Sequence, residues 1–157
     1  MDGSVVVKYN IVSSMKITIL SIFPEYFDSI LQSSIIKRAI EQQKVVVECV
    51  DIRQFATDKH QLTDDRPFGG GAGMVMKVEP IDAALTAVCE GNSTIKTKKI
   101  LTSAKGRTFD QVVARQYAEL DHLVIVCGHY EGVDERVAQH LVDEEVRIGD
   151  YVLTGGE

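Results

Sequence analysis

Two glycine-rich loops near the end of the chain carry the residues best suited to binding a ligand. The first reads Cys127-Gly-His-Tyr-Glu-Gly132, and the second reads Ile148-Gly-Asp-Tyr-Val-Leu-Thr-Gly-Gly156. Glycines at such places let a ligand approach the backbone, whose amides and carbonyls then form the recognition surface. Within the first loop, Tyr130 could stack on a ring, and Glu131 could accept hydrogen bonds from a base edge or hold a cation.

A third loop, Leu101–Arg107, follows an apolar run and precedes a predicted helix. Ligands of open α/β sheets bind at the carboxyl ends of strands, which makes Ser103 and the backbone of Gly106 candidate contacts. A plain strand-to-helix turn is the alternative for this loop taken alone. Three glycine-bearing strand ends in one sheet form a stronger signal than any one of them.

The segment Asp64–Met74 holds four glycines within five residues, a density that excludes a helix or strand interior. It lacks the Lys-Ser/Thr of a phosphate-binding P-loop, and GxGxxG is absent. We expect a loop that closes over a large planar or phosphate-bearing substrate, with Arg66 supplying charge and Pro67 and Phe68 stiffening the hinge. A flexible surface loop is the alternative.

The elements that must position these loops alternate along the chain. Strands are predicted at Lys16–Phe23, Val45–Ile52, Lys98–Thr102 and Leu123–Cys127, and helices at Pro24–Leu31, Ile35–Gln43, Pro80–Val88 and Val112–Leu120. The strands are rich in Ile and Val without strict polar alternation, which is typical of strands covered on both faces. The sequence therefore predicts an α/β domain with a mainly parallel sheet flanked by helices.

Smaller patterns add local expectations. Thr108 and Gln111 have the spacing of a capping box at the last of these helices. Asp134 and Glu135 are expected to complement a helix dipole, a further short strand is expected within 148–156, and 143–145 is expected to be a solvated acidic turn. The segment 54–77 is the longest without a clear element, and such loops are often functional.

Composition limits the classes of protein. With 157 residues, 45% hydrophobic and 25% charged, the chain fits one soluble domain, and its net charge of −6 argues against a simple electrostatic nucleic-acid binder. A solvated edge is favoured over a nucleic-acid patch for the cationic cluster Lys96, Lys98, Lys99, Lys105 and Arg107. The three cysteines lack CxxC spacing, which favours reduced thiols and a cytoplasmic protein. No apolar run reaches the roughly 20 residues of a membrane span. Residues 1–14 are expected to be a poorly ordered extension.

Five segments in order resemble the N-terminal catalytic domain of bacterial tRNA (guanine-N1)-methyltransferases, members of the SPOUT superfamily. They are 22–25, 58–60, Asp64–Met74, Gly128–Arg136 and Ile148–Glu157, and the last two are highly specific for the family. The resemblance covers 15–157 and implies a deep trefoil knot. It also implies an S-adenosylmethionine-dependent homodimer that methylates N1 of the guanosine just 3′ of the anticodon in tRNA.

The resemblance also implies roles for individual residues. The cofactor-binding set is Leu101, Thr102, Ser103, Gly106, Gly128, Tyr130, Glu131, Ile148, Gly149, Asp150, Tyr151, Val152, Leu153, Gly155 and Gly156. The substrate-binding set is Asp64, Arg66, Gly73, Met74, Ala104, His129 and Glu131. A divalent cation such as magnesium is a further candidate ligand. Many relatives have Pro at the position of Ala104 and Arg at that of His129, so we expect a less rigid loop and a lost permanent charge.

In the family, the catalytic base, an assisting arginine, the last helix of the knot and the tRNA-binding domain follow the position of Glu157. We therefore expect no catalytic base within this chain, and little or no activity from 157 residues alone. Two rival functions remain at this stage. One is a non-catalytic knotted domain that binds cofactor or tRNA and dimerises, and the other is a nucleotide-binding enzyme that uses Gly69–Gly73 for phosphate.

Overall fold

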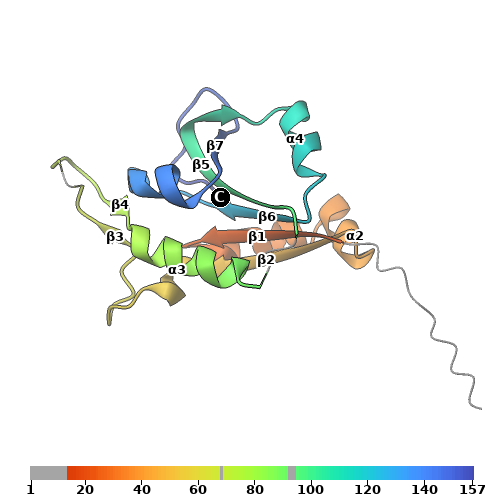
Figure 1. Ribbon diagram of the computed structural model, residues 1–157, viewed down its shortest axis with the longest axis horizontal. Coiled ribbons are helices and arrows are strands. Elements are labelled where there is room, and N and C mark those ends of the chain that lie inside the picture. The colour runs from red at the N-terminus through yellow and green to blue at the C-terminus, as the bar shows by residue number, and fades with distance from the viewer. Residues whose placement is uncertain (1–13, 68, 92–94) are drawn as a thin grey trace, which may run out of the picture.

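The computed structural model describes residues 14–67, 69–91 and 95–157 (Figure 1). The predicted extension over 1–14 lies almost entirely outside these ranges, and so does Phe68 of the predicted hinge. A five-stranded parallel sheet forms the centre, in the order β2-β1-β6-β5-β7. Its strands are β1 Met15–Ser21, β2 Val45–Asp51, β5 Thr97–Thr108, β6 His122–Val126 and β7 Glu144–Arg147. The predicted α/β fold with a mainly parallel sheet is confirmed.

Helical segments cover both faces of the sheet (Figure 1). They are η1 Pro24–Phe27, α1 Asp28–Leu31, α2 Ser34–Glu41, η2 Ile52–Phe55, α3 Val78–Cys89, α4 Gln111–Tyr117 and η3 Val137–Leu141. All four predicted helices are present within a few residues of their expected bounds. None of the helices in the described ranges has the length and apolar character of a membrane span.

Alternate residues of the central strands enter separate cores, as a doubly covered sheet requires. Leu20 of β1 packs with α3 and η3, whereas its neighbour Ile19 packs with Phe27 on the opposite face. In β6, Val124 likewise faces α3, and Leu123 faces α4. The continuous apolar character of these strands thus reflects burial on both sides and not a helical pattern.

The long segment between β2 and α3 contains a small arm. Strands β3 Asp64–Asp65 and β4 Val75–Met76 pair antiparallel, and the glycine-rich stretch joins them. The backbone of β4 is anchored to the loop after β6, because Met76 N donates to Gly132 O at 2.9 Å. The later part of the segment 54–77, for which no element is predicted, is therefore a hairpin attached to the glycine-rich loop Cys127–Gly132.

Three local expectations are wrong. The acidic stretch 143–145 is not a solvated turn, because Glu144 begins strand β7 and its side chain is mostly buried. The expected strand within 148–156 is absent, and this described stretch contains only a single bridge, between Gly155 and His129. The N-cap of α4 is Asp110, whose carboxylate accepts from Val113 N at 2.9 Å, and not Thr108.

Candidate functional site

Three loops meet at the carboxyl ends of β1 and β6, beside the middle of β5. The hydroxyl of Thr102 donates to Val126 O at 3.3 Å and accepts from Gly128 N at 3.1 Å. Gly156 N in turn donates to Gly128 O at 2.7 Å, and Gly155 forms an antiparallel bridge with His129. The chain therefore brings parts of all three predicted cofactor loops together, at the edge of the sheet where α/β proteins bind ligands.

The glycines at this junction have no room for a side chain. A Cβ added to Gly156 would overlap Thr102 Oγ1 and lie 2.9 Å from Gly128 N. At Gly155, it would lie 2.7 Å from Nδ1 of His129. Glycine is thus required here by the close approach of the chains, whichever ligand the junction binds.

The loop Leu101–Arg107 forms a bulge in β5. Val146 of β7 pairs with both Thr102 and Arg107, so the four residues 103–106 leave the regular ladder. Leu101 is buried in the core, and Ala104 is exposed at the outside of the bulge. A Cβ on Gly106 would overlap the β7 backbone, with Glu145 O only 2.7 Å away. The predicted loop is therefore present, but as an irregular part of a longer strand and not as a strand-to-helix turn.

The loop Cys127–Gly132 joins the glycine-rich arm to the sheet. Glu131 N donates to Met74 O at 3.0 Å, and the Glu131 side chain packs directly against Gly73, whose φ is +88°. Tyr130 adopts a left-handed φ of +58°, which is uncommon for a residue with a Cβ. The structure thus groups three of the predicted substrate residues: Gly73, Met74 and Glu131.

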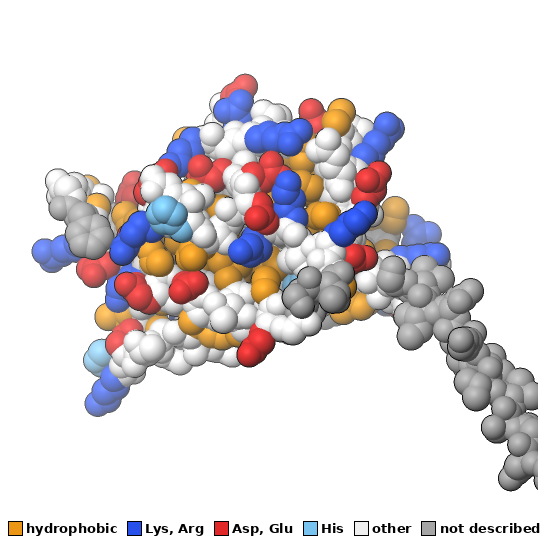
Figure 2. Space-filling model, in the orientation of Figure 1, with side chains coloured by type: hydrophobic (Ala, Val, Ile, Leu, Met, Phe, Trp, Pro, Cys, Tyr) orange, Lys and Arg blue, Asp and Glu red, His pale blue; other side chains and the backbone are white. Residues whose placement is uncertain are grey.

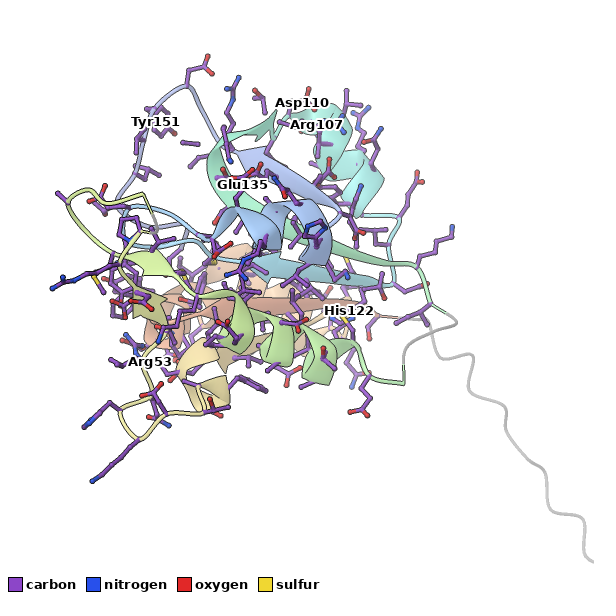
Figure 3. All side chains as sticks on the ribbon, turned by 60° about the vertical axis from the view of Figure 1, so that its left-hand side comes forward. Arg53, Arg107, Asp110, His122, Glu135 and Tyr151 are labelled. Atoms are coloured by element: carbon purple, nitrogen blue, oxygen red, sulfur yellow. The ribbon has the colours of Figure 1, made fainter. Side chains whose placement is uncertain are left out.

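The loop Ile148–Gly156 lies only partly within this junction. Val152 is 82% exposed, and Ile148, Tyr151 and Leu153 are also exposed. Figure 3 shows Tyr151 at the outer side of a loop that extends away from the sheet. Asp150 forms an ion pair with Arg147 at 2.9 Å. Residues 148–153 therefore lie at the surface as an apolar flap beside the junction, whereas Gly155 and Gly156 lie within it.

The remaining predicted substrate residues occupy different places. Asp64 belongs to the paired base of the arm, opposite Met76. Arg66 is exposed and lines a cavity of about 590 Å³, together with Lys77 and Asp134. His129 lies at the three-loop junction, with its ring edge against Phe23 at a centroid distance of 4.9 Å.

Sequence reasoning missed two polar residues of the junction, Ser21 and Glu157. Ser21 ends β1 and is fully buried, and its hydroxyl donates to Oε1 of Glu157 at 2.9 Å. The other oxygen, Oε2, lies 3.4 Å from Nδ1 of His129. The rule that polar groups at the carboxyl ends of parallel strands face the site would have found Ser21, whereas Glu157 has no signal of its own beyond the adjacent glycines.

The charges around the junction are mostly paired. The Asp134 carboxylate binds the Arg136 guanidinium at 2.7 Å, and this hydrogen bond lowers the pKa of Asp134. Lys105 pairs with Glu135, and Glu144 binds Lys98 at 2.8 Å and Arg107 at 3.6 Å. Figure 2 shows cationic and anionic side chains interspersed on one face. These pairs favour the solvated-edge interpretation of the cationic cluster over a nucleic-acid patch.

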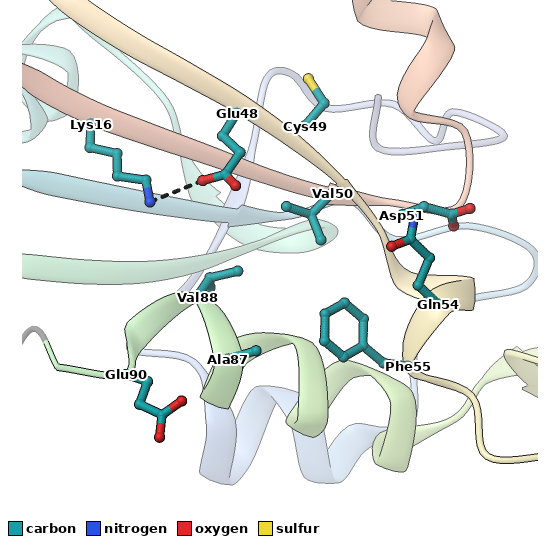
Figure 4. Close-up of a pocket in the computed structure, with 10 residues that line it drawn as sticks. All are labelled: Lys16, Glu48, Cys49, Val50, Asp51, Gln54, Phe55, Ala87, Val88 and Glu90. Atoms are coloured by element: carbon teal, nitrogen blue, oxygen red, sulfur yellow. Dashed lines mark ion pairs between the residues drawn. The ribbon is translucent and has the colours of Figure 1, made fainter.

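A second cavity, of about 580 Å³, lies away from the junction between the edge strand β2 and α3 (Figure 4). Its rim carries the ion pair of Lys16 and Glu48 at 2.9 Å, and Phe55 and Val88 supply apolar lining. None of the predicted site residues lines it.

The structure also describes the three cysteines and the side chains that could hold a metal ion. All three cysteines are free, Cys127 is buried and the other two are partly buried, and burial raises the pKa of Cys127 to about 12. A thiol with such a pKa is almost wholly protonated at neutral pH and is a poor nucleophile. In the part of the chain that the structure describes, no three His, Cys, Asp or Glu side chains are grouped to hold a metal ion.

The model of the tRNA (guanine-1)-methyltransferase family, TrmD, matches residues 15–157. The chain belongs to this family. A tRNA (guanine-N(1)-)-methyltransferase of Listeria innocua is 54% identical over 143 residues, which are 91% of this chain and 58% of the relative. One of Carboxydothermus hydrogenoformans is 53% identical, with 91% and 55% covered.

A solved structure gives the same result for the fold. The crystal structure of tRNA (m1G37) methyltransferase from Aquifex aeolicus matches with a TM-score of 0.80 at 36% identity, covering 91% of this chain and 63% of that one. The 157-residue chain spans just over half the length of the two curated relatives named above.

Proposed function

We propose that this protein transfers a methyl group from S-adenosylmethionine to N1 of the guanosine immediately 3′ of the anticodon in tRNA. Family membership over 15–157 and the activity named for relatives at 53–54% identity support the proposal. The observation that carries it is the meeting of three loops at Thr102, Gly128 and Gly156, where backbone groups form the walls. Cytoplasmic localisation, where tRNA is available, belongs to the same proposal.

Methyltransferases of this family generally use S-adenosylmethionine, whose sulfonium supplies an electrophilic methyl group. We place it between the β5 bulge, the loop Gly128–Glu131 and the flap 148–153. The side chains available around it are the half-buried Thr102 and Ser103 and the exposed Ile148, Tyr151, Val152 and Leu153. A bound adenine ring would cover apolar side chains of the flap that are otherwise exposed to water, which favours binding.

We assign the guanine to the group formed by Gly73, Met74, His129 and Glu131, with Asp64 and Arg66 on the arm that would close around it. A base must leave its stack to expose N1, so closure of this arm over a flipped guanine is expected. Glu131 could accept hydrogen bonds from the donor edge of guanine. Alignment of N1 with the methyl group then supplies much of the rate enhancement.

Methylation at N1 also requires removal of its proton, for which a carboxylate within hydrogen-bond reach is the natural acceptor. The negative charge that develops toward O6 needs fixed donors or a cation. We assign no described residue to that role. The trefoil knot likewise stays a prediction.

A divalent cation such as magnesium has a smaller place in the proposal. Mg²⁺ often binds through one or two carboxylates while it keeps several waters, and Glu131 is the single candidate ligand here. The described residues do not form a dedicated metal site. No step of the mechanism is therefore assigned to a metal ion.

We further propose that the protein works as a homodimer. Helices α1 and α2 contain no buried residue, and they expose Ile30, Ile35 and Ile36. Tyr26 of η1 is exposed beside them. An apolar surface of this kind marks an interaction site in a soluble protein, and a second copy of the chain is the occupant that the family resemblance implies.

A methyl-transfer assay with the natural full-length protein tests the function. Labelled S-adenosylmethionine is supplied with a tRNA transcript that has guanosine 3′ of the anticodon, and with a matched transcript that has adenosine there. We expect incorporation only into the first, with the product identified as 1-methylguanosine. Equal incorporation into both would contradict the substrate assignment, and cofactor binding without any turnover would favour the non-catalytic alternative.

A further inference from the structure

We propose that Glu157 is a positioning residue that sets the tautomer of His129, so that the neutral imidazole presents an unprotonated Nε2 at the substrate pocket. The inference rests on the proposed function for the identity of the substrate. Its first step, the coupling of the two side chains, depends only on the geometry of the described residues.

The Glu157 carboxylate is held in place from below. Its side chain is 7% exposed, and Oε1 accepts a hydrogen bond from the Ser21 hydroxyl at 2.9 Å. Ser21 is itself fully buried, and its oxygen accepts from Phe23 N at 2.8 Å. A hydroxyl has one proton, so Ser21 can donate only to Glu157 in this arrangement. The chain of hydrogen bonds fixes the carboxylate and leaves Oε2 to face His129.

The contact with Oε2 determines which ring nitrogen carries the proton. Nδ1 of His129 lies 3.4 Å from Oε2, and an ionised carboxylate can only accept a hydrogen bond. Nδ1 must then be the donor, and a neutral imidazole has only one N–H, so Nε2 keeps its lone pair. The absence of a side chain at Gly155 permits this approach, because a Cβ there would lie 2.7 Å from Nδ1.

The second nitrogen is available to a ligand. The His129 side chain is 20% exposed, and Nε2 is not among the buried side-chain atoms without a partner in the described ranges, so it is not sealed inside the protein. The ring is packed edge-on by Phe23 at 4.9 Å and by Tyr130 at 5.2 Å between centroids. These apolar contacts restrain the ring without distinguishing its nitrogens, which leaves that choice to Glu157.

The resulting chemistry suits guanine. The exocyclic amino group of guanine is a donor, and a bare Nε2 is the complementary acceptor. The opposite tautomer would place a donor against this donor and leave both without a partner, which disfavours binding. Glu157 thereby contributes to recognition of guanine without touching it.

Nuclear magnetic resonance of the ring nitrogens tests this directly. The natural full-length protein is labelled with ¹⁵N-histidine, and long-range ¹H–¹⁵N spectra are recorded at about pH 8 to observe the tautomers of the neutral ring. The 157 residues contain four histidines, and a His129→Gln variant identifies the signals of His129. We expect the Nδ1–H form in the wild type and a mixture of both forms in Glu157→Gln, because an amide can donate or accept.

Three variants separate positioning from a merely structural role. Glu157→Asp retains the carboxylate and should retain more of the Nδ1–H form than Glu157→Gln. Glu119→Gln, the same chemical change at an exposed residue after α4, should leave the spectrum unchanged. In the methyl-transfer assay, Glu157→Gln should raise KM for tRNA five- to tenfold, about the value of one hydrogen bond, with affinity for S-adenosylmethionine retained.

An Nε2–H form in the wild type would overturn the proposal, and so would an unchanged tautomer in Glu157→Gln. Loss of cofactor binding in Glu157→Gln with no change in tautomer would indicate a structural role instead. The spectra need no RNA substrate. Absence of methyl transfer by the wild type would therefore contradict the proposed function, while the spectra would still decide the role of Glu157.

Discussion

Gly106 lies where two strands approach so closely that no other residue fits. A Cβ there would meet the backbone of Glu145 and Val146, which cannot move without breaking the β5–β7 ladder. We expect Gly106→Ala to lower the free energy of unfolding by about 1–3 kcal/mol, the usual cost of overpacking. Urea unfolding followed by circular dichroism measures the change.

Gly69→Ala is the matched control for that substitution. Gly69 has no atom within 4 Å of an added Cβ, and its φ lies outside the left-handed region. The free energy of unfolding of the Gly69→Ala variant should therefore stay within about 0.5 kcal/mol of the wild-type value, as for most surface changes. Equal destabilisation of the two variants would mean that the close approach of β5 and β7 does not determine the need for glycine at 106.

His122 gives stability a pH dependence at the end of the sheet opposite the site. It is fully buried, with Nε2 2.8 Å from Thr18 Oγ1 and no partner for Nδ1 among the described residues. Burial, and to a lesser extent the charge of Lys16, lowers its pKa, although Glu48 acts in the opposite direction. The unfolded chain, with an ordinary histidine pKa of about 6.5, then binds the proton more readily than the folded protein.

The free energy of unfolding should therefore have its full contribution from neutral His122 above pH of about 6.5. Below that pH it should decrease, by at most about 1.4 kcal/mol per pH unit for one proton. Urea unfolding between pH 7.5 and 5.5, above most carboxylate titration, checks this. His122→Gln should flatten the slope, and the exposed His140→Gln should retain it. A slope that is unchanged in His122→Gln would contradict this assignment.

At the scale of the elements, the N-terminus of α4 has two candidate capping residues, Asp110 and Thr108. Asp110 accepts from Val113 N at 2.9 Å, whereas the Thr108 hydroxyl accepts from the Arg147 guanidinium at 3.1 Å. Asp110 lies at the junction of β5 and α4 in Figure 3. Asp110→Ala should cost about 1 kcal/mol of stability, and Thr108→Ala distinctly less, because only the former leaves a helix N–H without its cap. The opposite order in thermal unfolding would restore the capping box predicted from sequence.

The elements predicted correctly are those whose apolar pattern is continuous, such as β1 and β6, because burial on both faces leaves an unambiguous run. Strand β7 was not predicted, because the acidic residues Glu144 and Glu145 interrupt the apolar pattern that indicates a buried strand. The carboxylate of Glu144 is accommodated by Lys98 and by the Tyr117 hydroxyl at 2.6 Å, partners that are distant in sequence. Glu157 was missed for the same reason, since its role arises from a contact with Ser21 across 136 positions.

The proposed substrate tRNA is a polyanion, whereas the 157 residues carry an excess of acidic side chains. The net charge of −6 excludes uniform attraction for tRNA, and the cations near β5 are largely committed to Glu135 and Glu144. RNA contact by this chain is therefore expected to be confined to the arm and the three-loop junction. Binding there would depend on shape and hydrogen bonding more than on counterion release, and so would be only weakly sensitive to salt.

The apolar surface of α1 and α2 is the surface that we propose a second copy of the chain covers. Ile35 is 68% exposed and Ile30 is 56% exposed, and neither is covered within the described chain. Replacing both with Glu would bury two unpaired charges at a dimer interface, which is strongly unfavourable, but would disturb little in a monomer. We expect the natural full-length protein to sediment as a dimer and the double variant as a monomer.

Val112→Glu, on the exposed face of α4, controls for added charge, because Val112 is 59% exposed and far from that surface in sequence. A double variant that stays dimeric would contradict this interface and would point to another surface, of which the flap 148–153 would be tested next.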